Sequence, residues 1–192
     1  MSQLIGLAIL ATLTAPAQPP AAGKEVSYFP LQVGNTWHYK IGDKKVSAKV
    51  VAHEKIGDLE TAKIESSSDG DVVANENIAQ TAEGFVRVAF NGQKIDKPAL
   101  VLKLPPKKGE SWEVDTKIGN ETVKGKVVAG EEEIEVPAGK YKTVTSTGDY
   151  QINGQPAKIK TWFAPNVGPV KQELKLGGVE TIFELQKFEP AK

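Results

Sequence analysis

Apolar and polar residues alternate along most of this chain, in short runs separated by turn signals. The run Trp112–Ile118 shows the pattern: its even positions are Trp, Val, Thr and Ile, and its odd positions are Glu, Asp and Lys. The runs at residues 123–129 and 170–176 follow a similar alternation. A period of two is typical of a β-strand with one buried and one wet face. The pattern therefore predicts antiparallel strands.

Dipeptides suited to tight turns separate these runs. Seven of them are Gly42-Asp43, Gly57-Asp58, Asp69-Gly70, Asn91-Gly92, Gly119-Asn120, Asn153-Gly154 and Gly177-Gly178. Such pairs fit the two-residue turns that join antiparallel strands, because those turns need residues that accept a positive φ. Glu83-Gly84 and Ala138-Gly139 indicate two more turns. No long window carries a sustained apolar period of 3.6 residues, so no helix is predicted.

The runs and turns together predict about 12 short strands in an antiparallel meander. A sheet of this size with one apolar face must curl over that face or split into two layers. We therefore predict an all-β fold, curled into a barrel or half-barrel. A β-sandwich is the alternative.

All three tryptophans lie beside a turn that contains Pro and Gly. The pattern Pro-x-x-x-Gly-x-x-Trp ends at Trp37 and again at Trp112, and Trp162 stands just before a third such turn at residues 163–168. The aromatic residues near these turns are Trp37, Tyr39, Trp112, Trp162 and Phe163. They either line a concave ligand surface or fill the core where strands end. The recurring turns favour the core interpretation. Two lysines share the strand face of Trp162, so Trp162 is expected to be closer to solvent than Phe163.

The N-terminus has the order of a secretory signal. Residues 1–23 carry no charged side chain, and residues 4–13 form the apolar run LIGLAILATL. Ala15-Pro16-Ala17 fits the small-x-small pattern of a cleavage site. We predict a signal peptide over residues 1–17, with Gln18 as the first mature residue, although the usual Lys or Arg is missing from its start.

The rest of the chain is predicted as a linker and one domain. Residues 18–27 are rich in Pro and Ala and are expected to be flexible, and residues 28–192 are expected to form a single all-β domain. A periplasmic or extracellular location follows from the signal peptide. The mature protein is not expected to span a membrane, because the apolar run is shorter than the roughly 20 residues that a spanning helix needs.

Composition excludes several chemistries. Lys plus Arg equals Asp plus Glu at 24 each, which gives no electrostatic reason to expect nucleic-acid binding. Arg87 is the single arginine, and this scarcity argues against bidentate recognition of phosphate or carboxylate groups. The chain has no cysteine, which removes thiol catalysis, Cys-based metal sites and disulfides.

Catalytic and metal motifs are also lacking. His38 and His53 are the only histidines, and no G-x-S-x-G motif accompanies them. Two histidines are too few for a zinc site, and the acidic run at residues 131–133 lacks the spacing of a calcium loop. No Gly-rich phosphate loop is present. We predict no metal, no cofactor and no enzymatic activity, with a hydrolase that uses two carboxylates as a minor alternative.

Three motifs carry a resemblance to other proteins. They are Y-x-P-L-x-x-G-x-x-W-x-Y at residues 28–39, V-P-A-G-K-Y at residues 136–141 and W-F-A-P-N-V-G-P-V-K at residues 162–171. Together they resemble a loose group of uncharacterised secreted bacterial β-rich domains, in which Gly is usual at the position of Asn166 and an apolar residue at that of Pro169. The resemblance implies export and a curled sheet similar to the half-barrels of bacterial lipoprotein carriers. It implies no activity.

The sequence therefore predicts a non-catalytic exported domain that binds a partner or forms a structural part of the bacterial cell envelope. The partner is left open between a hydrophobic small molecule and an envelope protein. The alternative is a carrier of a lipid or another hydrophobic ligand in the concave face of the sheet. A carrier needs a cavity that stays open, whereas an interaction module needs a filled core with an exposed patch or edge strand.

Overall fold

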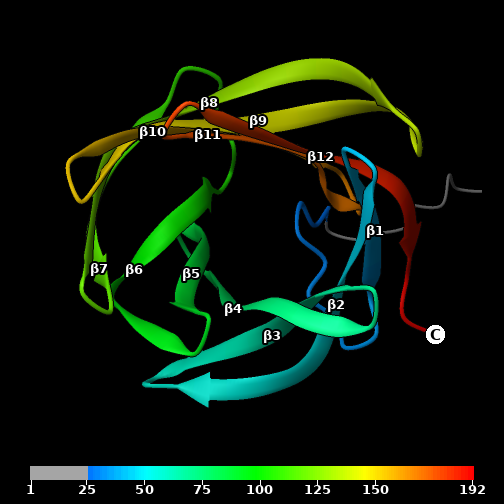
Figure 1. Ribbon diagram of the computed structural model, residues 1–192, viewed down its shortest axis with the longest axis horizontal. Coiled ribbons are helices and arrows are strands. Elements are labelled where there is room, and N and C mark those ends of the chain that lie inside the picture. The colour runs from blue at the N-terminus through cyan, green and yellow to red at the C-terminus, as the bar shows by residue number, and fades with distance from the viewer. Residues whose placement is uncertain (1–25) are drawn as a thin grey trace, which may run out of the picture.

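The computed structural model describes residues 26–192, which form a closed antiparallel β-barrel (Figure 1). Its strands are β1 (Thr36–Ile41), β2 (Lys44–Ile56), β3 (Leu59–Ser68), β4 (Asp71–Thr81), β5 (Gly84–Phe90), β6 (Gln93–Lys103), β7 (Ser111–Ile118), β8 (Glu121–Val136), β9 (Gly139–Ile152), β10 (Gln155–Ala164), β11 (Gly168–Leu176) and β12 (Val179–Glu189). Each strand pairs with the next one along the chain, and β12 pairs with β1. The predicted meander and barrel are confirmed, and closure decides against the half-barrel and the sandwich.

The part of the chain that the structure describes begins at residue 26, after most of the predicted N-terminal segments. The predicted signal peptide, residues 1–17, lies outside the described residues, as do residues 18–25 of the predicted linker. Ser27, at the end of that linker, exchanges hydrogen bonds with Asn166: its amide donates to the side-chain oxygen at 3.2 Å, and its carbonyl accepts from the Asn166 amide at 2.7 Å. Over residues 26–192 there is no helix of the length and hydropathy that crossing a membrane requires.

The two ends of the barrel differ in the turns that they carry. Because the strands alternate in direction, the turns after β1, β3, β5, β7, β9 and β11 all lie at one end, which we call the mouth. All six are two-residue turns, and they are six of the seven turn dipeptides named above. The seventh, Gly57-Asp58, lies at the other end together with loops that contain Pro105, Pro137 and Pro165.

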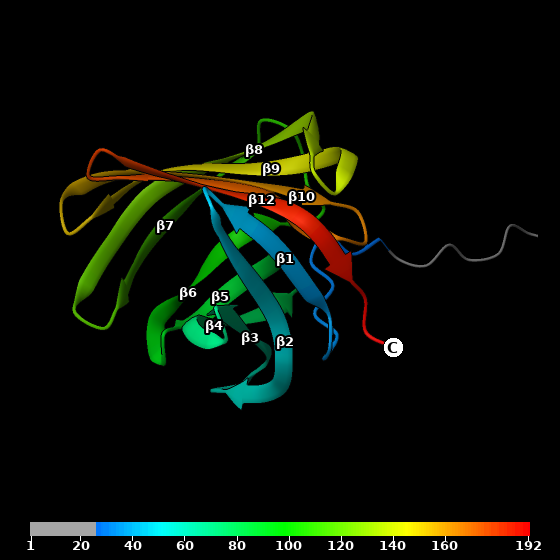
Figure 2. The same cartoon turned by 45° about the vertical axis from the view of Figure 1, so that its right-hand side comes forward.

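The N-terminal segment plugs the end opposite the mouth. Phe29 is only 7% exposed, and its ring packs against three other aromatic rings. These are Trp37, Phe85 and Phe163, at centroid distances of 5.7, 5.8 and 6.1 Å. Figure 2 shows the blue N-terminal segment and the red C-terminal tail near each other at this end. We call this set of rings the aromatic plug.

Asn35 joins the two terminal segments. Its side-chain amide donates to the carbonyl of Pro30 at 2.8 Å, and its side-chain oxygen accepts from the amide of Ala191 at 2.7 Å. The residue is 2% exposed, so these bonds satisfy a side chain that would otherwise be costly to bury. The plug is therefore held by polar bonds as well as by aromatic packing.

The inner wall carries its largest cluster of buried side chains near the plug and some half-buried apolar side chains toward the mouth. The large core cluster draws its buried side chains from the plugged half of the strands. Toward the mouth, the register places Ile159 and Leu174 side by side on the inner wall, and both are only half-buried. At the mouth itself, Leu176 and Val179 are 37% and 67% exposed. The barrel is thus closed by a large packed cluster at the plugged end, and its inner wall carries partly exposed apolar side chains near the mouth.

Candidate binding site

The five aromatic residues predicted for a ligand surface lie in three different places. Trp37, Tyr39 and Phe163 face the barrel interior at or next to the plug. Trp112 lies on the inner face of β7, where its indole reaches the backbone of β6, and Trp162 lies on the outer face of β10. They do not form one continuous surface, because neighbouring positions on a strand point to opposite sides of the sheet.

Trp37 connects the first and third of the Pro/Gly turns. Its indole nitrogen donates to the carbonyl of Val167 at 2.6 Å, and its ring stacks on Phe188 at 5.5 Å. Gly168 lies directly against it: a Cβ at that position would come within 3.3 Å of the indole nitrogen and 3.2 Å of Pro30. Asn166, in the same turn, has a φ of 60°, which is a conformation that Asn accepts as Gly does.

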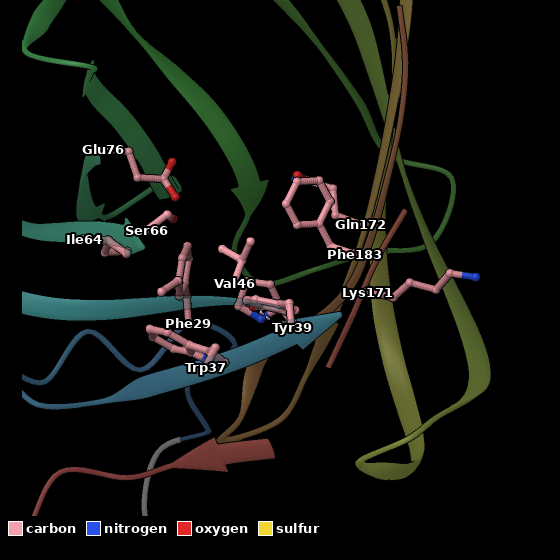
Figure 3. Close-up of a pocket in the computed structure, with 12 residues that line it drawn as sticks. Phe29, Trp37, Tyr39, Val46, Ile64, Ser66, Glu76, Lys171, Gln172 and Phe183 are labelled. Carbon is pink, nitrogen blue, oxygen red and sulfur yellow. Dashed lines mark hydrogen bonds between the residues drawn. The ribbon is translucent and has the colours of Figure 1, made fainter. Parts of the chain in front are cut away.

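A hollow of about 110 Å³ lies next to the plug (Figure 3). It is lined by Phe29, Trp37, Tyr39, Val46, Ala48, Ile64, Ser66, Glu76, Pro169, Lys171, Gln172 and Phe183. The hydroxyl of Tyr39 donates to the carbonyl of Pro169 at 2.8 Å. Burial, together with the carboxylate of Glu76, raises the pKa of Tyr39 well above its usual range. The phenol therefore stays neutral and acts as a donor.

An ion pair lies on the wall of this interior. The Nε of Arg87 donates to Oε2 of Glu76 at 2.6 Å. The register pairs Glu76 with Ile64 and Arg87 with Ile78, and both isoleucines are buried in the core cluster, so the ion pair faces inward. The side chains of Arg87 and Glu76 are 30% and 24% exposed, so solvent reaches them inside the barrel.

Aromatic rings flank this ion pair. The guanidinium of Arg87 lies over the ring of Phe90 at 5.7 Å. Burial raises the pKa of Tyr150, and the charge of Arg87 acts in the opposite direction. The ring of Tyr150 lies flat over Gly148 and Gly125, where an added Cβ would come within 2.2 and 2.5 Å of it. These two glycines leave the room that the tyrosine occupies on the inner wall.

Arg87 is an interior residue that the sequence pattern did not reveal. It lies in the run Gly84–Phe90, GFVRVAF, where both strand faces are apolar and no alternation tells which way the arginine points. A single charged residue within such a run was the signal that could have identified it.

The pairing of β6 with β7 is the weakest in the barrel. It consists of Ile95 with Ile118, whereas the other neighbouring strands pair over five residues or more. Side chains of β7 take the place of ladder bonds: the indole of Trp112 donates to the carbonyl of Leu100 at 2.9 Å. The hydroxyl of Thr116 accepts from the amide of Lys97 at 3.1 Å and donates to its carbonyl at 2.9 Å. Trp112 therefore has a role in closing the barrel.

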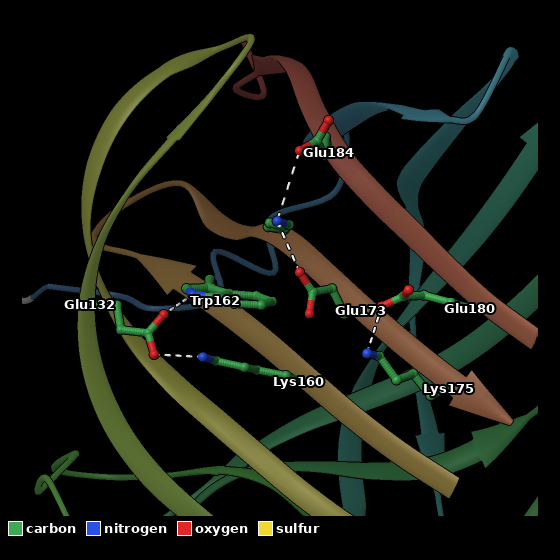
Figure 4. A network of polar contacts seen from close by, with 8 residues as sticks. Glu132, Lys160, Trp162, Glu173, Lys175, Glu180 and Glu184 are labelled. Atoms are coloured by element: carbon green, nitrogen blue, oxygen red, sulfur yellow. Dashed lines mark hydrogen bonds and ion pairs between the residues drawn. The ribbon is translucent and has the colours of Figure 1, made fainter. Parts of the chain in front are cut away.

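Trp162 is buried although it lies on the outer face. Its indole nitrogen donates to Oε2 of Glu132 at 2.8 Å (Figure 4). The amines of Lys160 and Lys171 lie 4.5 and 5.2 Å from its ring centroid, which leaves the side chain 4% exposed. The strand pattern predicts that Trp162 lies beside lysines, and it does. The long side chains of Lys160 and Lys171 cover the indole ring, and this explains why Trp162 is buried on an outer face.

Glu132 is expected to stabilise the barrel in a pH-dependent way. Burial raises its pKa, but hydrogen bonds from Lys160 and Trp162 and the lysine charges outweigh burial and lower the pKa below 4.5. A lowered pKa stabilises the fold above the ordinary pKa, and this stabilisation is lost as the pH falls through the lowered value.

The measurement is the free energy of unfolding of Glu132→Gln and of the wild type, at neutral pH and in acid. The difference should be largest at neutral pH and should shrink below pH 4.5. Glu133→Gln is the matched control, because Glu133 is 75% exposed and its ion pair with Lys142, at 3.5 Å, lies in solvent. An effect of Glu132→Gln that stays constant with pH would contradict the assigned cause.

The histidines do not meet. Nε2 of His53 lies 2.7 Å from the carbonyl of Leu31, and His38 lies 3.7 Å from Glu189. Across residues 26–192, no three His, Asp or Glu side chains are grouped so as to hold a metal ion.

The fold and this site define a closed antiparallel barrel with one plugged end and an interior ion pair. A family model described as DUF3108-like matches residues 86–175, which is 90 of the 192 residues. No curated protein matches the chain. The chain is thus similar to that family over its central strands.

Two solved structures are similar to this chain over most of its length. The first is described as a "putative lipoprotein" from Parabacteroides distasonis; it is 14% identical, covers 85% of this chain and 99% of its own, and has a TM-score of 0.53. The second is described as a "putative exported protein with YmcC-like fold" from Bacteroides fragilis; it is 12% identical, covers 84% and 98%, and has a TM-score of 0.48. At this identity the first likeness shows that the fold is shared.

Proposed function

We propose that this protein is an exported, non-enzymatic domain of the bacterial cell envelope that binds an apolar or amphipathic small molecule inside its barrel, between the aromatic plug and the mouth. The observation that carries the proposal is the difference between the two ends. One end is plugged by aromatic rings, whereas the other has half-buried apolar side chains on its inner wall. Apolar surface that faces a hollow is typical of small-molecule sites.

Other observations support the location and the lack of catalysis. The signal-like N-terminus and the description of the Parabacteroides distasonis protein as a lipoprotein both favour the envelope. The carboxylate in the lining of the hollow is Glu76, and it is paired with Arg87 at 2.6 Å. A glycosidase needs two carboxyl groups that face each other across the substrate, so a single paired carboxylate at this place weakens the hydrolase alternative.

Binding is tested by titrating the purified protein with the fluorescent probe N-phenylnaphthylamine and by mass spectrometry of co-purified lipid. Leu174→Lys places a charge on the inner wall and is expected to weaken probe binding by about tenfold or more, since burying a charge next to the probe is unfavourable. Ile182→Lys is the matched control, because Ile182 pairs with Glu173 and lies on the outer face next to Leu174. No probe binding to the wild type, or equal binding to both variants, would contradict the proposal.

Export is tested by expressing the full chain in a bacterium and sequencing the N-terminus of the secreted or periplasmic material. The expected first residue is Gln18, because Ala15-Pro16-Ala17 fits the cleavage pattern. Protein retained inside the cell with Met1 in place would overturn the proposed location.

A further inference from the structure

The only arginine of the chain faces the barrel interior, whereas many lysines pair with acids on the outer face. Exposed outer pairs are Lys124 with Asp115, Lys140 with Glu135, Lys158 with Asp149 and Lys175 with Glu180. Arg87 is four residues from the mouth turn that begins at Asn91. At about 3.3 Å per residue, this places it roughly 13 Å along the strand from the mouth. Phe85, two residues further in, belongs to the aromatic plug.

Part of the guanidinium is free to bind another group. Glu76 is the ion-pair partner that the described residues provide for Arg87, and it contacts Nε. A guanidinium has five N–H donors, and its paired nitrogens match the two oxygens of a carboxylate or phosphate, so this one inward-facing arginine can provide the bidentate recognition that the scarcity of arginine argued against. Because the side chain is 30% exposed inside the barrel, a ligand can reach these donors by displacing water.

The wall on the other side of the hollow is apolar. Figure 3 shows Phe183 across the hollow from Glu76. Phe183 pairs with Gln172 on β11, and Leu174 follows on the same face, next to Ile159. This face continues toward the exposed Leu176 and Val179 at the mouth. An apolar chain can lie along these side chains while a polar group at its inner end reaches Arg87.

We propose that the barrel binds an amphiphile with one anionic headgroup, a carboxylate or a phosphate, and that Arg87 binds this headgroup while the apolar chain lies along β10 to β12 toward the mouth. This inference rests on the proposed function, because it names the ligand class for the same hollow. Glu76 competes with the headgroup for the guanidinium, so it limits the affinity of the site.

The test is calorimetric titration with decanoate, decyl phosphate and decanol, which share one apolar chain. The wild type should bind at least one of the two anions about tenfold or more tightly than decanol. Arg87→Met should abolish this preference, and Glu76→Gln should increase it, because the guanidinium is then free. Lys117→Met is the matched control: it removes an exposed positive charge from the outer face of β7 and should change nothing.

Inorganic phosphate, titrated alone, distinguishes a free anion from a headgroup. Binding of inorganic phosphate as tightly as decyl phosphate would overturn the amphiphile. Equal binding of all three decyl ligands by the wild type would overturn the role of Arg87 and leave the proposed function intact, whereas no binding of any of them would overturn both. Weaker anion binding in both single variants would show that the ion pair is only structural and would also overturn the inference.

One further variant removes ambiguity about folding. If Arg87→Met alone does not fold, the double variant Glu76→Gln/Arg87→Met removes both charges of the ion pair, so neither partner is left unpaired. It should still bind decanol and should show no preference for the anions. A preference that persists in a folded double variant would contradict the inference.

Discussion

Trp37→Ala is expected to lower the free energy of unfolding by about 3–5 kcal/mol, the range seen when large buried aromatic side chains are truncated. The side chain is 1% exposed, and its ring packs against Phe29 and Phe188. Its indole nitrogen also donates to Val167 at 2.6 Å. Truncation would leave a cavity beside the plug and an unpaired carbonyl, so both packing and hydrogen bonding would be lost.

Chemical denaturation with both fluorescence and circular dichroism measures this effect. Trp37→Phe is the matched control, because it keeps a ring in the plug and removes the indole donor, and it should cost about 1–2 kcal/mol. A Trp37→Ala variant as stable as the wild type would contradict the interpretation that this tryptophan seats the strand ends. It would instead favour the aromatic ligand surface that the sequence left as an alternative.

Gly84→Ala is expected to destabilise the barrel by about 4 kcal/mol or more, which is exceptional for a single methyl group. Gly84 begins β5 with a φ of 141°, and an added Cβ would lie 2.1 Å from the carbonyl oxygen of Leu102 and 2.9 Å from the Cα of Lys103. Both contacts are with backbone atoms of the paired strand β6, which cannot move aside without breaking the pairing.

Gly92→Ala separates this clash from the cost of the backbone conformation. Gly92 has a φ of 73°, and nothing lies within 4 Å of the position that its added methyl group would take. It should therefore cost only about 1–2 kcal/mol, the penalty for a left-handed L-residue. Thermal unfolding of both variants provides the comparison. Equal losses of stability in the two variants would contradict the prediction, because they would mean that β5 and β6 can move apart at Gly84 without a free-energy penalty.

Only part of the candidate site could be predicted from the sequence. The strand pattern correctly places Trp37 and Tyr39 on one face, and the register confirms that Trp162 shares a face with Lys160. The role of Arg87 could not be predicted, because both faces of its strand are apolar. Its inward direction follows from pairing with Ile78 on β4, which is a contact between strands.

The sequence by itself determined the strands, the turns and the antiparallel order, because these depend on side-chain period and on residues that accept positive φ. Only the tertiary structure decided closure, since β1 and β12 meet across almost the whole domain. It also decided which end is plugged, and it brought the first and third Pro/Gly turns together at Trp37. These features depend on packing between segments far apart in the chain, and local patterns do not encode the direction in which a curled sheet closes.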